Sequence, residues 1–64
     1  MKKEISWIGE TAHLSIEATP IEGITELNRI GATVNSVTGT RVTGMMNCTL
    51  EEANELIDNG WQWV

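Results

Sequence analysis

Few side chains in this sequence could act directly in catalysis. The chain of 64 residues has one histidine, His13, one cysteine, Cys48, and no tyrosine. A cysteine nucleophile needs a base within hydrogen-bonding distance, and that base needs a third group to orient it. Cys48 directly precedes a predicted helix, whose N-terminus could lower the pKa of the thiol, but His13 falls on the solvent side of a predicted strand. We therefore expect no catalytic site and predict that the protein is not an enzyme.

The residue types also argue against a metal or phosphate site. Structural zinc needs four nitrogen or sulfur ligands, and this chain supplies two, one histidine and one cysteine. No Gly-rich phosphate-binding loop is present. The acids Glu51, Glu52, Glu55 and Asp58 are dense, but they occupy helical positions rather than the spacing of a calcium-binding loop. We expect no metal and no cofactor, and we interpret these acids as a solvated helix face.

The charge of the chain limits the classes of partner. Nine acids against four bases give a formal net charge of −5. Nucleic acids and anionic membranes attract clustered Lys and Arg, so neither is an expected partner. The charge permits a basic protein partner, and the alternative interpretation is that it serves solubility alone. No segment approaches the roughly 20 apolar residues of a membrane span. A single cysteine, which can form no internal disulfide, suits a reducing compartment, and we expect a cytoplasmic location.

Four elements and a final strand must position these side chains, and the first is a hairpin over residues 4–18. Gly9-Glu10 suits a two-residue turn of type II′. This turn would place Trp7 opposite Ala12 and gather apolar residues on one face of the hairpin.

A second hairpin is predicted over residues 32–46, which are rich in β-branched side chains. A three-residue loop, Val37-Thr38-Gly39, would place its glycine at the left-handed position that such loops require. With this loop, Val34 would lie opposite Val42.

The first helix is predicted to start after Thr19, the expected N-cap, with Pro20 at its first position. Gly31 is expected to follow its last turn. Helical spacing predicts a buried apolar stripe made of Ile21, Ile24, Leu27 and Ile30.

The second helix has the strongest local signal, a capping box in which Thr49 and Glu52 satisfy each other's backbone amides. Asn59-Gly60 is expected to end this helix. Its predicted apolar face consists of Leu50, Ala53, Leu56 and Ile57. The last residues, Trp61 to Val64, are predicted to form a short strand with both tryptophans on one face.

From residue 12 onward the predicted order is β-α-β-β-α-β, the ferredoxin-like split β-α-β arrangement. The fold class is therefore α+β, with an antiparallel sheet that carries two helices on one face and leaves the other face open. The residues before this unit would add an N-terminal edge strand. The chain is expected to form a single domain over residues 1–64.

Three surfaces of this predicted fold could bind a partner. The outer surface of the helices carries six of the nine acids, namely Glu22, Glu26, Glu51, Glu52, Glu55 and Asp58. The open sheet face is expected to present His13, Ser15, Glu17, Thr33, Asn35, Arg41, Thr43 and Met45. The third is the C-terminal segment, whose tryptophans suit either a core or an interface hot spot. The candidate partner-binding residues are Trp61, Trp63, Val64, Asn35, Arg41, Thr43, Met45, Glu51 and Glu55.

Residues 24–64 resemble the subtilisin-propeptide family, which includes stand-alone protease inhibitors. The resemblance lies in Leu27, Gly31-Ala32, the strand from Val34 to Val37, Thr43-Gly44, Leu50-Glu51-Glu52-Ala53 and a last strand ending at Val64. It implies that the open sheet face packs on a protease and that the C-terminal residues enter the substrate cleft.

Two further likenesses bear on function. The helix Leu50–Leu56, followed by a Trp-rich end, is similar in size, charge and pattern to short acidic phage proteins that bind and disable host enzymes. The turn between Ala18 and Ile24 resembles ligand-binding regulatory domains of the ACT type.

The sequence therefore predicts a small non-catalytic acidic protein that binds and inhibits another protein, a host enzyme or a protease. The binding surface would be the open sheet face or the acidic helix face. The alternative is a homodimeric domain of ACT-like type that binds or sequesters a small molecule. Self-association is expected in either case to be favourable, because a chain this short gains little stability from one core.

Overall fold

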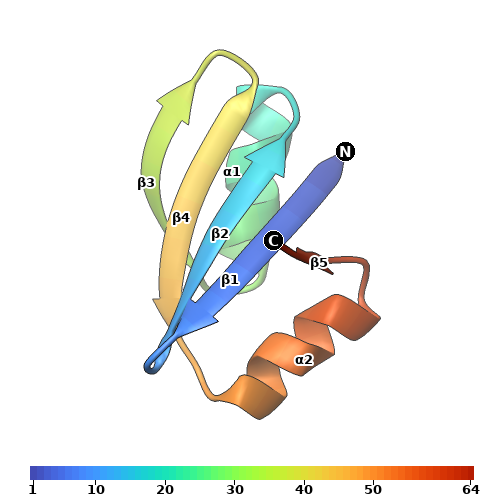
Figure 1. Ribbon diagram of the computed structural model, residues 1–64. Coiled ribbons are helices and arrows are strands. Elements are labelled where there is room, and N and C mark those ends of the chain that lie inside the picture. The colour runs from blue at the N-terminus through green and yellow to red at the C-terminus, as the bar shows by residue number, and fades with distance from the viewer.

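The computed structural model describes residues 1–64 and consists of two β-hairpins, two helices and a short final strand. In chain order the elements are β1 (Lys2–Ile8), β2 (Thr11–Glu17), α1 (Pro20–Arg29), β3 (Thr33–Thr38), β4 (Arg41–Asn47), α2 (Leu50–Asp58) and β5 (Gln62–Trp63). All strands join one sheet in the order β3-β4-β2-β1-β5 (Figure 1). The α+β fold and the order of its elements confirm the prediction from the sequence.

The position of β1 differs from the prediction, which placed it at the edge of the sheet. β5 lies outside it and pairs in parallel with Glu4 and Ile5, so the edges are β3 and the two-residue β5. β2 pairs with β1 along one side and with β4 along the other. The chain returning from α2 can therefore join this end of the sheet only along the free side of β1.

The first hairpin follows the predicted register, with Trp7 opposite Ala12. Gly9 has a φ of 65°, and no residue other than glycine has a positive φ. This combination fits the type II′ turn expected at Gly9-Glu10. The local turn signal was thus sufficient to determine the pairing of β1 with β2.

The second hairpin is tighter than predicted. Thr38 lies opposite Arg41, so the loop contains only Gly39 and Thr40. Val34 lies opposite Gly44 rather than Val42, and a β-bulge follows it in β3. The bulge accommodates one extra residue and keeps both valines of β3 on the face that packs against the helices.

Both helices start at the predicted residues. The Thr19 side chain caps α1, and the complete capping box of Thr49 and Glu52 opens α2. The predicted stripe of α1 is wrong at Ile21, whose side chain is 79% exposed. The buried stripe instead includes Gly23, which lies about 200° around the helix from Ile21.

Two glycines let the layers approach closely. A Cβ atom on Gly23 of α1 would lie 2.5 Å from Cγ2 of Val42. A Cβ atom on Gly44 of β4 would lie 2.5 Å from the carbonyl oxygen of Thr33 and 2.9 Å from Cδ1 of Leu27. Side chains at these positions would separate α1 from the sheet and β3 from β4.

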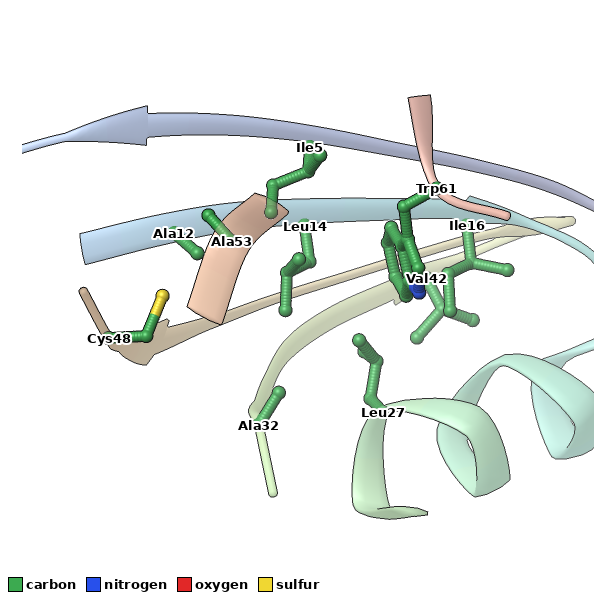
Figure 2. Packing of buried hydrophobic residues seen from close by; sticks show 10 residues of the cluster. All are labelled: Ile5, Ala12, Leu14, Ile16, Leu27, Ala32, Val42, Cys48, Ala53 and Trp61. Atoms are coloured by element: carbon green, nitrogen blue, oxygen red, sulfur yellow. The ribbon is translucent and has the colours of Figure 1, made fainter. Parts of the chain in front are cut away.

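One hydrophobic core lies between the sheet and both helices, which therefore cover the same face. Figure 2 shows Leu27 of α1 and Ala53 of α2 directed toward the same layer of strand residues. Trp61, which is 1% exposed, is the largest fully buried side chain. The buried cluster consists of Ile5, Ala12, Leu14, Ile16, Leu27, Ala32, Val42, Cys48, Ala53 and Trp61. Neither helix has the length and apolar character needed to cross a membrane.

Candidate functional site

The structure separates the two residues considered for nucleophilic catalysis. His13 is exposed on the open face of β2, opposite Met45. Cys48 is buried in the core on the other face, and burial, assisted by the charge of Glu52, raises the pKa of its thiol. The pKa of this thiol is thus raised rather than lowered, chiefly by desolvation. No group of three or more His, Cys, Asp or Glu side chains is placed to hold a metal ion.

The acids of α2 form an exposed surface with no opposing charge. Glu51, Glu52, Glu55 and Asp58 are all exposed, and none of them takes part in an ion pair. The helix carries no basic residue. Glu52 also completes the capping box, where its Oε1 atom accepts a hydrogen bond from the backbone amide of Thr49 at 2.9 Å. We call these four acids, together with Leu50, the α2 surface.

On α1, Glu26 is paired with basic side chains, whereas Glu22 is exposed and accepts a hydrogen bond from the Thr19 hydroxyl at 2.8 Å. The unpaired acids are therefore densest on α2. Glu26 accepts hydrogen bonds from Lys3 Nζ at 3.2 Å and from Arg29 Nε at 2.9 Å, and its side chain is 13% exposed. Hydrogen bonds from the Arg29 guanidinium, opposed by burial and assisted by Lys3, lower the pKa of Glu26 to about 2. Two of the four basic side chains thus pair with Glu26, which is not available to a partner.

The open sheet face presents Arg41, Thr43 and Met45 from alternate positions of β4, as predicted. Asn35 has no partner on β4, because the bulge places Ser36 opposite Thr43. The two hydroxyl oxygens lie 2.6 Å apart. Sequence alternation missed Ser36 because nothing local marks the bulge.

Several polar groups on this open face already bond to one another. Arg41 donates to Ser15 Oγ at 2.8 Å and lies 4.0 Å from a carboxylate oxygen of Glu17. Thr11 donates to Asn47 at 3.2 Å. A partner on this face would have to replace these bonds or contact them from outside.

The three C-terminal candidates differ in how far they are exposed. Trp61 is in the core and cannot contact a partner from the surface. Trp63 is 44% exposed and Val64 is 86% exposed. The amide of Val64 donates to the carbonyl oxygen of Ile5 at 3.0 Å, which holds this end of the chain against β1.

A shallow pocket adjoins the α2 surface and was not predicted. It has a volume of about 490 Å³ and is lined by Trp7, Glu10, Asn47, Cys48, Thr49, Leu50 and Glu52. Trp7 forms part of its apolar wall and donates from Nε1 to the carbonyl oxygen of Cys48 at 2.9 Å. The pocket joins the end of β1 to the start of α2, segments about 40 residues apart along the chain, so no local pattern could reveal it.

A second hollow, of about 580 Å³, lies at the other end of the molecule. It is lined by Met1, Lys2, Glu17, Ala18, Thr19 and Thr40. Ala18 and Thr19 belong to the turn that resembles ACT domains, but the hollow is wide and shows no buried polar group that would orient a ligand.

No protein-family model, curated protein or solved structure gives a significant match to this chain.

Proposed function

We propose that this chain is a non-catalytic protein that binds a basic surface of another protein through the α2 surface. One observation carries the proposal. Four exposed acids lie on a nine-residue helix without a single basic side chain or ion pair to balance them. Such an unbalanced patch attracts a partner of opposite charge over a distance of about one Debye length.

The α2 surface supports binding better than the open sheet face, which was the other expectation. Several polar side chains of the open face bond to one another, as in the contact of Arg41 with Ser15. The exposed carboxylates of Glu51, Glu55 and Asp58 have no charged protein partner at all. Their full charge is therefore available for recognition.

The neighbouring pocket supplies the apolar contact that a specific interface needs. Charge alone mainly accelerates association, whereas affinity depends on buried apolar anchors. Leu50 is 47% exposed beside the wall formed by Trp7. A partner segment that presents one apolar side chain flanked by Lys or Arg would fill this pocket while its cations contact Glu51 and Glu55.

Inhibition is the form of this function that we propose, with an enzyme as the partner. A domain that binds a basic surface beside a substrate site inhibits by covering that site and needs no reactive group of its own. The unpaired Cys48 is consistent with a partner in the reducing cytoplasm.

The test compares two variants that lose the same charge from different surfaces. The immobilised wild type, a Glu51→Gln/Glu55→Gln variant and a Glu17→Gln/Glu22→Gln control are each incubated with extract of the native host. We expect the wild type and the control to retain the same protein, to release it as salt is raised, and to inhibit it if it is an enzyme. The α2 variant should retain at least tenfold less. Equal retention by both variants, or repeated absence of any retained protein, would refute the proposal.

A second candidate function, small-molecule binding, is favoured by the size of the pocket beside Trp7. Its volume of about 490 Å³ falls within the usual range of ligand sites. A ligand of this pocket should raise the melting temperature of the wild type and should fail to do so for a Leu50→Asp variant. Melting temperatures that stay constant across a metabolite panel would remove this candidate.

A further inference from the structure

The outer edge of β3 has no neighbouring strand. β3 pairs only with β4, and every residue of β3 is exposed except Val34, which is half-buried. Figure 1 shows the outer side of β3 uncovered, with α1 lying behind the sheet. The amides and carbonyls along this side are therefore open to pairing with another strand.

This edge lacks most of the features that keep sheet edges apart. Natural proteins block exposed edges with Lys, with Pro, with very short strands or with bulges. β3 has six residues, Thr33–Thr38, and contains no charged residue and no proline. The opposite edge is protected, because β5 has only two residues. The bulge after Val34 is the only device of this kind in β3.

The bulge also makes the edge self-complementary. Val34 and Val37 lie three positions apart, yet both pair with residues of β4 whose side chains face the helices. Thr33 and Thr38 both pair with residues on the open face. In an antiparallel pair of two β3 strands, Val34 of one copy can therefore face Val37 of the other. The same register sets Thr33 against Thr38, so the valine and threonine pairs match in face, with the bulge at the centre of the shared edge.

From this symmetry we infer that β3 is the site at which two copies of this chain associate, forming one continuous ten-stranded sheet across a two-fold axis. A two-fold interface requires a surface that is complementary to itself, and the matched valines and threonines satisfy that requirement. The inference is independent of the partner proposed for α2.

The distribution of charge favours a second copy at this edge over association elsewhere. Each chain carries a net charge of −5, so two copies repel one another wherever acids meet. β3 is uncharged and lies at the opposite end of the sheet from α2 and its four acids (Figure 1). Pairing through β3 keeps the two α2 surfaces at the far ends of the dimer, where both stay accessible.

The test compares a lysine substitution on the β3 edge with a lysine substitution on β1. Sedimentation velocity of the wild type should show a monomer that becomes a dimer as concentration rises into the high micromolar range. Val37→Lys should remain monomeric at concentrations at least tenfold higher, because each lysine would then lie against Val34 of the other copy, and a lysine on an edge strand opposes such pairing. Ile8→Lys is the matched control. This apolar residue is 69% exposed and lies on β1, which β4 and β2 separate from β3. It should dimerise like the wild type.

Hydrogen exchange locates the interface. The amides of residues 33–38 should exchange more slowly as the wild type dimerises, while those of β5 should not change. Thr38→Lys, at an exposed position, is a second edge variant in case Val37→Lys alters the fold. A wild type that stays monomeric at every concentration overturns the inference and assigns the edge to other strands. Dimers that persist in both edge variants, or that leave the β3 amides unprotected, overturn it as well.

Discussion

Gly44 lies where three parts of the fold meet, and no other residue fits there. Its position on β4 faces the carbonyl oxygen of Thr33 on β3 and Cδ1 of Leu27 on α1. The backbone oxygen is held by the sheet and cannot move aside as the end of a side chain could. A methyl group here would therefore displace β3 itself.

We predict that Gly44→Ala lowers the free energy of unfolding by about 2 to 3 kcal/mol, as measured by urea denaturation. Thr43→Ala, at the adjacent position on the open face, should cost less than about 1 kcal/mol, because only an exposed hydrogen bond to Ser36 is lost. Equal effects of the two substitutions would contradict the close packing.

Glu26 couples the stability of the protein to pH. Its pKa is lowered from 4.5 to about 2, chiefly by the hydrogen bond from Arg29. A carboxylate with a depressed pKa in the folded state contributes its full stability above the unfolded value. That stability is lost as pH falls from 4.5 toward 2, because the unfolded chain binds its proton first.

We predict that Glu26→Gln costs about 1 to 2 kcal/mol at pH 7, a value reduced from the full linkage figure because Arg29 is exposed to solvent. The difference from the wild type should shrink as urea denaturation is repeated at pH values between 4.5 and 2. Glu55→Gln, which removes an unpaired acid, is the control and should show no such loss. A difference that stays constant with pH would show that the ion pairs do not stabilise the fold.

At the scale of elements, β5 is held by its preceding residue more than by its own hydrogen bonds. The strand has two residues, and only Glu4 and Ile5 pair with it. Trp61, directly before it, is buried among the strands and α1 (Figure 2). Lys3 Nζ lies 5.5 Å from the centre of its ring, which adds a cation–π contact.

We predict that Trp61→Ala lowers the free energy of unfolding by about 3 to 5 kcal/mol, the range for truncating a buried aromatic residue. Trp63→Ala should cost much less, because that side chain is 44% exposed. Thermal melts and urea titrations of the two variants provide the comparison. If Trp63 proved the more costly position, the assignment of Trp61 as the core residue would be wrong.

The two hairpins show how far local signals extend. The first hairpin has the predicted register because Gly9-Glu10 favours one type of turn. With that turn, the apolar residues of β1 and β2 lie opposite one another on the same face. In the second hairpin, Gly39 could serve either a two-residue or a three-residue loop. Packing decided between them, since only the bulged register places Val34 and Val37 together over the helices.

At the scale of the whole molecule, one core serves both helices. Leu27, Ala53 and Trp61 belong to the same buried cluster, so α2 has no separate set of contacts that could hold it alone. A chain of 64 residues also buries too little surface to sustain two independent cores.

We therefore predict a single cooperative unfolding transition. Far-UV circular dichroism, which follows the helices, and tryptophan fluorescence, which follows the core, should give the same melting temperature. An earlier loss of helical signal would show that α2 unfolds independently and that its acidic surface is only loosely attached to the sheet.

Charge distribution was only partly accessible from the sequence. The count of acids on two helices was correct, but Glu26 is matched by Lys3, which lies 23 residues away along the chain. Only the fold brings those two side chains together. The candidate surface therefore narrowed from two helices to α2, and the pocket beside Trp7 was added to it.

The features that the sequence determined all depend on residues close together along the chain. They include the turn at Gly9, the caps at Thr19 and Thr49, and the order of strands and helices, because dihedral preference and periodicity act over a few residues. The tertiary structure alone decided the place of β5, the bulge in β3, the burial of Trp61 and the pairing of Glu26. Each of these depends on which segments far apart along the chain meet, and that is decided by packing over the whole core rather than by any local pattern.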